Sequence, residues 1–306
     1  MSPSCSATIR RSWRSSTSSA ATATGLSASQ SWIVPPKLGI LAGKGELPRR
    51  LIEACHAEGR EVFVIAFPGE TDRAVAESVS HAWLPIAQVG GILRALHEAQ
   101  VEEVVLAGAI RRPSFLSLKP DRRGLSLLGK ITRGRMGDDG ILSLAVAELE
   151  SEGFRVVGLD ELLPDTLAPE GPLGRLKPDD SADSDISRGF EVAVALGRVD
   201  VGQAVIVQHG AVLGVEAIEG TDALIARCAD LKRDGPGGIL VKVSKPGQEQ
   251  RVDLPTIGVR TVTAAAAAGL RGIAIEAGAT VVVGRQAVAK AADQAGLFVV
   301  GVRFPR

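Results

Sequence analysis

The chain has 306 residues, of which 45% are hydrophobic, 3% are aromatic and none is tyrosine. This length and hydrophobic content allow a sizeable core and slightly favour two domains over one. The 35 glycines and the scarcity of aromatic rings favour an α/β protein over an all-β sandwich, and they make base-stacking surfaces improbable.

The distribution of charge argues against a nucleic-acid partner. Lys+Arg and Asp+Glu both number 35, but Arg10, Arg11, Arg14 and Lys37 all precede the first acidic residue, Glu46. After residue 37 the chain has 31 basic and 35 acidic residues, a net charge of −4. Nucleic-acid binding usually requires a basic face. A few local Lys or Arg side chains can still bind one anionic ligand.

Cysteine and histidine spacing argues against disulfides and zinc. Cys5, Cys55 and Cys228 form neither a disulfide framework nor a CxxC pair, so a reducing cytoplasm is the simplest setting. The four histidines lack metal-ligand spacing, which disfavours a His-based zinc site.

Residues 1–37 are rich in Ser, Thr and Ala, contain Arg but no acid, and have no apolar run long enough for a signal peptide. We expect a disordered N-terminal extension. Its composition resembles that of a transit peptide, although an extension without a structural role explains it more simply. No segment elsewhere reaches about 18 consecutive apolar residues, so no membrane span is predicted.

Residues 38–162 are predicted to form the first domain. An apolar strand over 38–42 and a Gly-rich turn lead into a helix that has Leu47, Leu51 and Cys55 on one face. Further strands are predicted at 61–67, 81–86, 102–110 and 155–159, and helices at 90–100 and 140–153. Fully apolar strands that alternate with helices indicate a Rossmann-like parallel sheet covered on both faces.

A second domain is predicted over 186–306, after a linker at 163–185 that is dense in Pro, Gly, Asp and Ser. The domain begins with a helix at about 186–197. Two Val-rich runs around His209-Gly210 follow and predict a β-hairpin, so this α/β domain should mix antiparallel and parallel strands. The remaining expected elements are a helix over 221–233, a strand over 237–244, and then helix, strand, strand, helix and strand.

Two segments of the first domain could bind a ligand. Gly43, Lys44 and Gly45 directly follow the first strand, where doubly wound folds bind phosphates. The dinucleotide fingerprint is broken because Pro48 replaces its third glycine, and no Ser or Thr follows the Gly-Lys pair as a P-loop requires. A ligand loop and a merely structural turn therefore both stay open. Gly108 and Arg111 lie at the carboxyl end of a predicted strand, where Arg111 or its neighbour Arg112 could face a phosphate.

Asp138 and Asp139 stand just ahead of a predicted helix, where carboxylates cap free N–H groups. Capping explains one of the two acids. The other leaves a ligand or substrate role open.

The stretch VEAIEGTD carries three acids, Glu216, Glu219 and Asp222. Thr221 is predicted to be a helix N-cap and Asp222 to lie in the first turn, where the helix dipole stabilises a carboxylate and attracts phosphate. Mg²⁺ would reconcile these two anions, because it takes one or two carboxylates together with phosphate oxygens. Glu216 is a candidate second metal ligand, while Glu219 is expected to be solvated. A plain helix cap at Asp222 is the structural alternative.

Three basic residues further along the chain, Lys242, Lys245 and Arg251, have the charge that neutralises a diphosphate. Ordinary surface charge is the alternative for each, and we prefer it for Lys245.

Five segments taken together resemble a known family. In chain order they are GILAGKGELP, GAIRRPS, GDDGIL, VEAIEGTD and KPGQEQRVDLPTIG. They resemble the LpxI-type UDP-2,3-diacylglucosamine pyrophosphatases of the lipid A pathway, over residues 38–306. The resemblance implies a cytoplasmic, Mg²⁺-dependent hydrolase that splits the UDP-lipid into UMP and 2,3-diacylglucosamine 1-phosphate. It also implies two α/β domains with the lipid in an interdomain crevice, and a catalytic role for Asp222 in the Thr221-Asp222 motif.

The resemblance and the residue chemistry lead to one hypothesis. Asp222 binds Mg²⁺ or orients the attacking water, while Lys242 and the loop at Gly43 hold the phosphates and uridine. Peripheral contact with the inner membrane is expected, because the substrate carries two acyl chains. The alternatives are a nucleotide-dependent oxidoreductase and a non-catalytic module that binds a nucleotide sugar or a lipid. The first lacks the usual acid at the end of the second strand, which continues as Phe67-Pro68-Gly69.

Overall fold

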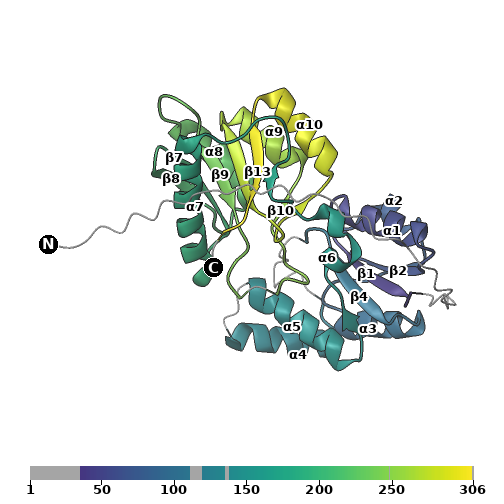
Figure 1. The fold of residues 1–306 in the computed structure, drawn as a ribbon. Helices are drawn as coiled ribbons and strands as arrows, with labels where there is room; N and C mark the ends of the chain where they lie inside the picture. The colour runs from purple at the N-terminus through teal and green to yellow at the C-terminus, as the bar shows by residue number, and fades with distance from the viewer. Residues whose placement is uncertain (1–34, 111–118, 135–137, 248, 305–306) are drawn as a thin grey trace, which may run out of the picture. The chain divides into compact units, whose positions relative to one another are not determined.

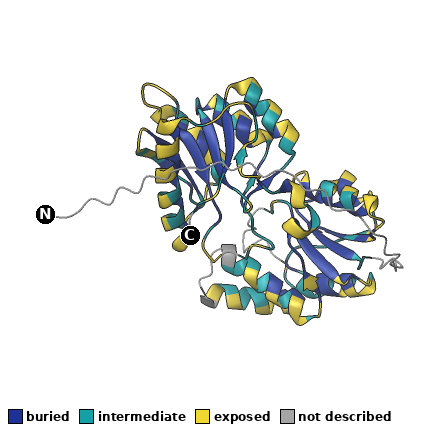
Figure 2. Cartoon of the chain, in the orientation of Figure 1, coloured by how far each residue is buried: buried dark blue, intermediate teal, exposed yellow. Residues whose placement is uncertain are grey.

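The computed structural model describes residues 35–110, 119–134, 138–247 and 249–304 (Figure 1). These residues form two main sheets flanked by helices, and the strands are buried while the outer helix faces are exposed (Figure 2). Within the described residues, no helix combines the length and the apolar character that crossing a bilayer requires.

The first sheet has the order β3-β2-β1-β4-β5, and all its pairs are parallel. Its strands are β1 (Leu38–Ala42), β2 (Val62–Ala66), β3 (His81–Trp83), β4 (Glu103–Ala107) and β5 (Arg155–Val156). Its helices are α1 (Leu47–Ala57), α2 (Arg73–Ala76), α3 (Val89–Glu98), α4 (Arg122–Gly134), α5 (Asp138–Ser151) and α6 (Leu159–Leu162). The predicted Rossmann-like parallel sheet is confirmed.

Alternate residues of these strands pack on opposite faces of the first sheet. Ile40 and Ala42 of β1 join one core with Leu51 of α1, whereas Leu41 joins another with Leu93 of α3.

Helix α4 was not predicted from the sequence. Leu127, Leu128 and Ile131 recur at helical spacing, but the three glycines of the segment, Gly124, Gly129 and Gly134, weaken its helical signal.

The second main sheet has the order β6-β13-β11-β9-β7-β8. Its strands are β6 (Gly171–Pro172), β7 (Ala204–Gln208), β8 (Ala211–Val215), β9 (Ile239–Lys242), β11 (Gly272–Glu276) and β13 (Phe298–Val302). The three strands β9, β11 and β13 are parallel, whereas β7, β8 and β6 pair antiparallel with their neighbours. The expected mixture of strand directions is thus confirmed.

The predicted hairpin joins β7 to β8 through His209 and Gly210. Both residues have positive φ angles, 51° and 74°, as a type I′ two-residue turn requires. The side chain of Asp185, which is buried beneath the turn, accepts hydrogen bonds from both backbone amides at 3.0 and 2.6 Å. The sequence therefore predicted the turn, while the structure reveals the carboxylate that anchors it.

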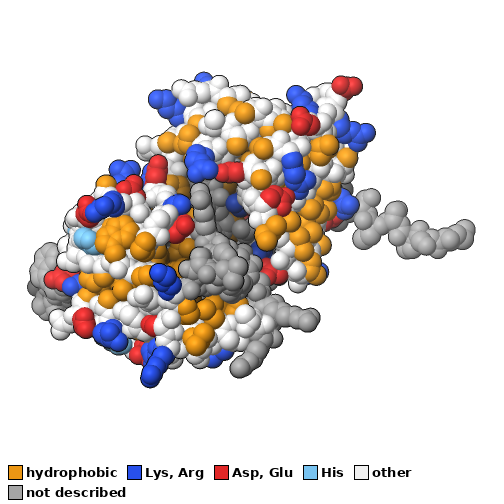
Figure 3. All heavy atoms as spheres, turned by 180° about the vertical axis from the view of Figure 1, so that it is seen from behind, with side chains coloured by type: hydrophobic (Ala, Val, Ile, Leu, Met, Phe, Trp, Pro, Cys, Tyr) orange, Lys and Arg blue, Asp and Glu red, His pale blue; other side chains and the backbone are white. Residues whose placement is uncertain are grey.

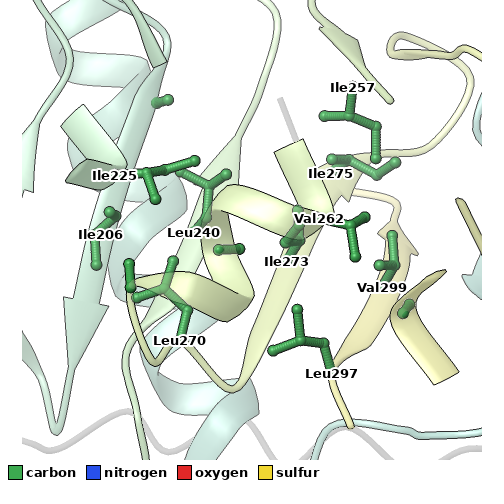
Figure 4. Close-up of a cluster of buried hydrophobic side chains, with 14 of the residues drawn as sticks. Ile206, Ile225, Leu240, Ile257, Val262, Leu270, Ile273, Ile275, Leu297 and Val299 are labelled. Atoms are coloured by element: carbon green, nitrogen blue, oxygen red, sulfur yellow. The ribbon is translucent and has the colours of Figure 1, made fainter. Parts of the chain in front are cut away.

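Four main helices cover the second sheet: α7 (Asp180–Arg198), α8 (Thr221–Cys228), α9 (Val259–Ala267) and α10 (Arg285–Ala295). The cluster in Figure 4 joins strand residues such as Ile206, Leu240 and Ile273 to Ile225 of α8 and Val262 of α9. A separate cluster packs α7 against the other face of the sheet. Helix α7 begins six residues before the predicted start, because the Asp179 side chain accepts the backbone N–H of Ala182 at 2.7 Å and caps it.

The remaining elements are short. They are the 3₁₀ turns η2 (Pro164–Thr166) and η3 (Ala229–Leu231), and a parallel pair of strands, β10 (Thr256–Ile257) and β12 (Val281–Val282). The helix predicted over 221–233 ends earlier, because Cys228 leads into η3. Leu231 of η3 is exposed. Val281 of β12 belongs to the buried cluster that contains Leu38 and Ile40 of β1. A residue from the second half of the chain therefore contributes to the core of the first sheet.

Candidate functional site

Antiparallel pairing brings Glu216 and Lys242 together at one edge of the second sheet. Lys242 is the last residue of β9 and pairs with Ala204, the first residue of β7. The backbone N–H of Glu216, directly after β8, donates to the carbonyl of the same Ala204 at 2.8 Å. Residues 26 positions apart in the sequence thus become neighbours because β7 runs between their strands.

A chain of hydrogen bonds links these two residues to the start of α8. Lys242 Nζ donates to Thr221 Oγ1 at 3.0 Å, and Thr221 Oγ1 donates to Glu216 Oε1 at 2.6 Å. Lys242 Nζ also donates to the Thr256 carbonyl at 3.1 Å, and Glu216 Oε2 accepts the backbone N–H of Gln203 at 3.1 Å. The side chains of Lys242, Thr221 and Glu216 therefore hold one another in fixed orientations.

Lys242 is a buried cation, with a relative exposure of 7%. Desolvation lowers the pKa of its ammonium group, while the negative charges of Glu216, Asp222 and Asp253 act in the opposite direction. A cation in this position provides a strong local field, and its charge is sensitive to loss of the neighbouring carboxylates.

Asp222 lies in the first turn of α8, and its side chain is 60% exposed. Its Oδ2 accepts a hydrogen bond from Arg260 Nη2 of α9 at 2.7 Å, but Arg260 is itself 90% exposed. The carboxylate therefore lies at the surface, within electrostatic range of the buried Lys242 and beside an exposed cation.

The predicted N-cap role of Thr221 is wrong by one residue. The N-cap is Gly220, whose φ of 82° favours glycine, and Thr221 is the first helical residue. Its hydroxyl forms hydrogen bonds with Glu216 and Lys242 and does not cap the helix. The sequence could not distinguish these roles, because the competing partner comes from a distant strand.

Sequence reasoning missed a second buried carboxylate on the same edge. Glu276 is the last residue of β11, and its Oε2 accepts hydrogen bonds from the backbone N–H of Ser244 at 2.9 Å and from its hydroxyl at 2.8 Å. An acid at the end of an otherwise apolar strand was the signal available in the sequence.

The two other basic residues considered for phosphate binding have protein partners. Lys245 Nζ lies 2.7 Å from Asp200 Oδ1, and only 11% of its side chain is exposed, so its preferred interpretation as ordinary surface charge is wrong. Arg251 pairs with Glu249 at 2.8 Å and with Glu150 of α5 at 2.6 Å. Arg251 thereby ties the loop after β9 to the first domain.

The loop after β1 contains two glycines that the fold itself requires. A Cβ added at Gly43 would lie 2.6 Å from the carbonyl oxygen of Ala109, and one added at Gly108 would lie 2.6 Å from that of Lys44. The backbone amides of Lys44 and Ala109 donate to each other's carbonyls at 2.8 and 3.0 Å. The ends of β1 and β4 therefore approach too closely for side chains at these two positions.

Lys44 and Gly45 line a hollow at the carboxyl ends of β1 and β2, with a volume of about 490 Å³. Arg49, Thr71 and Asp72 also line it. Lys44 Nζ lies 3.5 Å from Glu70 Oε2. Both readings of the loop thus have support: Gly43 and Gly108 serve the backbone, while Lys44 and Gly45 face a space that could admit a polar ligand.

Three predicted residues receive no side-chain description. Arg111 lies outside the described residues. Asp138 and Asp139 are the first two residues of α5, which begins two residues before the predicted start, and their side chains are likewise outside the described part of the structure.

Charge and metal-ligand geometry limit the kind of site present. On the face in Figure 3, the described Lys and Arg side chains are interspersed with Asp and Glu. Among the described residues, no group of three or more His, Cys, Asp and Glu side chains is arranged to hold a metal ion.

Comparison with known proteins matches both halves of the chain. A model of the LpxI N-terminal domain matches residues 37–166, and one of the LpxI C-terminal domain matches residues 169–300. The UDP-2,3-diacylglucosamine pyrophosphatase LpxI of Caulobacter vibrioides is 44% identical over 273 residues, which cover 87% of this chain and 97% of that protein.

Solved structures give only weak likenesses. The CobK precorrin-6A reductase is 14% identical with a TM-score of 0.32, and the match covers 89% of each chain. The biotin carboxylase subunit of a pyruvate carboxylase is 16% identical with a TM-score of 0.24, over 56% of this chain and 34% of that one. These scores are too low to carry a functional argument.

Proposed function

Because the chain belongs to the LpxI family, we propose that it hydrolyses the diphosphate of UDP-2,3-diacylglucosamine to UMP and 2,3-diacylglucosamine 1-phosphate, a step of lipid A biosynthesis. The observation that carries this proposal is the 44% identity to a UDP-2,3-diacylglucosamine pyrophosphatase across 97% of that protein's length. The linked side chains at Lys242, Thr221 and Glu216 supply a chemical setting for it.

Mg²⁺ is part of the proposal, and Asp222 is the residue best suited to hold it. Magnesium commonly takes one or two carboxylates, keeps several waters and completes its shell with substrate phosphates. The exposed carboxylate of Asp222 suits such a partial protein site. When bound, the ion would neutralise charge that develops on the diphosphate.

Glu216 was predicted as a second metal ligand, and this role stays a prediction. Its hydrogen bonds favour a different one. Both carboxylate oxygens already accept hydrogen bonds, and the side chain is buried beside Lys242. We propose that Glu216 balances the lysine charge and fixes the Thr221 hydroxyl, so that α8 presents Asp222 in one orientation.

Lys242 was expected to bind phosphate directly. Two of its three N–H donors point to Thr221 and Thr256. We therefore propose that it acts mainly through position and field: it stabilises the ionised form of Asp222 and the negative charge that accumulates during phosphoanhydride hydrolysis. The exposed side chain of Arg260 can exchange its contact with the Asp222 carboxylate for one with a phosphate oxygen.

Access to the substrate requires contact with a lipid surface. A glucosamine that carries two acyl chains partitions into a bilayer, because each buried methylene contributes about 0.8 kcal/mol. We propose peripheral association with the cytoplasmic face of the inner membrane. The interdomain crevice implied by the family resemblance stays a prediction.

The purified chain should be incubated with UDP-2,3-diacylglucosamine in detergent micelles, with Mg²⁺ or with a chelator, and UMP release should be followed by chromatography. We expect UMP and the lipid 1-phosphate in equal amounts with Mg²⁺, and loss of both with the chelator. Binding of the UDP-lipid without any release of UMP would instead indicate a non-catalytic binding module. Turnover that persists in the chelator would remove Mg²⁺ from the proposal but leave the hydrolase in place.

A further inference from the structure

Large apolar side chains are exposed at the edge of the second sheet that carries Asp222. Ile218 is 94% exposed, Val199 is 69%, Val201 is 43% and Val259 is 40% exposed. These are four of the eight large hydrophobic side chains that are exposed among the described residues. Single exposed hydrophobic residues are normal on a protein surface, whereas a group of them at one place indicates a contact surface.

The antiparallel pair β7 and β8 brings two of the loops that carry these residues together. The loop 199–203 leads into β7 and the loop 216–220 leaves β8, so both lie at the same end of the pair. A Cβ added at Gly202 would lie 2.1 Å from the carbonyl oxygen of Glu216, which means that the two backbones touch. The exposed side chains beside this contact are Val199, Val201 and Ile218.

The same edge carries the carboxylate of Asp222. Ile218 lies four residues before Asp222, in the turn that leads into α8. Val259 directly precedes Arg260, whose Nη2 lies 2.7 Å from Asp222 Oδ2. Exposed apolar side chains therefore border this carboxylate from the loops around β7 and β8 and from the start of α9. We call the four residues Val199, Val201, Ile218 and Val259 the apolar rim.

The charges around the apolar rim suit an anionic surface. Arg198, the last residue of α7 and the neighbour of Val199, is exposed and has no side-chain partner in the described part of the chain. Three acids at this edge are each paired with a cation: Asp200 lies 2.7 Å from Lys245, Glu219 lies 3.0 Å from Arg227, and Asp222 lies 2.7 Å from Arg260. The charge of Arg198 is thus left unbalanced. Basic side chains beside exposed apolar ones favour binding to anionic lipids.

We propose that the apolar rim and Arg198 form the surface by which the protein docks on an anionic phospholipid bilayer, with Ile218 inserted among the acyl chains. The inference rests on the proposed function, which gives the protein a membrane lipid as its substrate and Asp222 as the residue that holds the metal. Docking at this edge brings the Asp222 carboxylate to the level of the lipid head groups. A second copy of the chain on the same surface would cover Asp222 and would leave the charge of Arg198 unused.

The test measures binding to vesicles and does not require turnover. The full chain is mixed with vesicles of phosphatidylcholine alone, or of equimolar phosphatidylcholine and phosphatidylglycerol, and bound protein is recovered by flotation. The wild-type chain should float with the anionic vesicles and less with the neutral ones. The double variant Val199→Ser with Ile218→Ser should lower the partition coefficient on anionic vesicles roughly tenfold or more. Arg198→Gln should lower it about fivefold, and on anionic vesicles alone.

Two further variants make the comparison specific to the apolar rim. Leu231 is 48% exposed and ends η3, which directly follows α8, so it lies at the opposite end of that helix from Ile218. Leu231→Ser is therefore the matched control and should keep the wild-type partition coefficient. Ile218→Trp should bind at least as tightly as the wild type, because an indole ring suits the membrane interface. Thermal unfolding establishes that each variant is folded before binding is compared.

The inference is wrong if the wild-type chain does not float with anionic vesicles, if the double variant floats as well as the wild type, or if Leu231→Ser loses as much binding as the double variant. Sedimentation velocity gives an independent check. A wild-type dimer that becomes a monomer in the double variant would make the apolar rim a subunit interface and would also overturn the proposal. Should the double variant fail to fold, Ile218→Trp and Arg198→Gln carry the same test. Absence of UMP release would refute the proposed function, whereas flotation would still decide whether this surface binds lipid.

Discussion

The two main sheets place their buried charges at opposite ends of their strands. In the first sheet, the buried pair Arg60 and Glu103 lies at the amino ends, since Glu103 opens β4, and Arg155 at the start of β5 joins it at 2.6 Å. In the second sheet, the buried charges Lys242 and Glu276 close their strands.

This difference indicates what kind of ligand the carboxyl-terminal edge of each sheet can bind. Parallel α/β sheets bind ligands at the carboxyl ends of their strands. The second sheet equips that end with fixed charges, which suits charge neutralisation during hydrolysis. The first sheet keeps its charges at the other end, where they fix strand starts, and has an apolar cavity and a glycine-lined loop towards the carboxyl ends. The comparison predicts that substitutions of these charges lower activity in the second sheet, whereas in the first sheet they lower stability and leave activity unchanged.

The largest effect is expected for Asp222→Asn, which removes one negative charge without changing size. If this carboxylate holds the metal or the water, kcat should fall roughly 10³-fold. The free energy of unfolding should change by less than about 1 kcal/mol, because the side chain is exposed in the first turn of α8. Steady-state UMP release and urea unfolding measure both quantities. Glu219→Gln, an exposed acid in the preceding turn, serves as the control and should retain wild-type kcat.

A smaller effect on activity, with a large effect on stability, is expected for Lys242→Met. It leaves the buried Glu216 carboxylate without the nearby positive charge of Lys242, and an uncompensated buried charge costs about 3–5 kcal/mol of unfolding free energy. The double variant Lys242→Met with Glu216→Gln removes both charges and should recover most of that loss in urea unfolding. Activity should stay at least about tenfold below wild type in the double variant, since the field at Asp222 is gone. Full activity in the recovered protein would show that Lys242 serves the fold alone.

Glu103→Gln tests the first sheet in the same way. Arg60 is buried and donates to Glu103, so loss of the carboxylate charge should lower the free energy of unfolding by about 2–3 kcal/mol. The value of kcat at a temperature where the variant stays folded should be within about twofold of wild type. A large fall in kcat would break the division between the two sheets, because this pair lies at the amino ends of the strands, away from the predicted ligand edge.

The smallest effect is expected for Asp121→Asn, which bears on the helices around the cavity. Asp121 accepts the backbone amides of Gly124 at 2.8 Å and Gly91 at 3.1 Å, so one carboxylate caps α4 and contacts the first turn of α3. Desolvation acts to raise the pKa of Asp121, but these hydrogen bonds outweigh it and the pKa is lowered. The variant should lose about 1 kcal/mol of unfolding free energy near pH 7.

The sign of the pH dependence follows from this lowered pKa. The folded state keeps Asp121 ionised to lower pH than the unfolded state does, so the stabilisation is complete above the ordinary aspartate value of about 3.9. It is lost as the pH falls through the lowered folded value. Urea unfolding of the wild-type protein and Asp121→Asn between pH 7 and pH 2.5 should therefore give curves that converge below about pH 4. A constant difference down to the lowest pH would mean that the charge of Asp121 has no part in the cap.

The sequence by itself was enough for the elements that local chemistry dictates. Continuous apolar runs located most strands and period-3.6 patterns most helices, and His209-Gly210 identified a turn that needs two positive φ angles. The order of strands and helices indicated a parallel first sheet and a mixed second sheet, and five short segments together indicated the family. Asp222 was singled out because a helix start is recognisable from a glycine, a hydroxyl and an acid in succession.

The tertiary structure alone decided which side chains form hydrogen bonds with one another. The local sequence predicts that Thr221 is an N-cap. Its hydroxyl instead accepts a hydrogen bond from Lys242, 21 residues away, because β7 brings the ends of β8 and β9 together. Glu276 and Ser244 meet for the same reason, across the neighbouring strands β9 and β11. The apolar cavity is likewise not visible in any one segment, since its wall is shared among the sheet, α3, α4 and α5. Local pattern fixes which face of an element is apolar, whereas packing between distant segments fixes whether that face is filled.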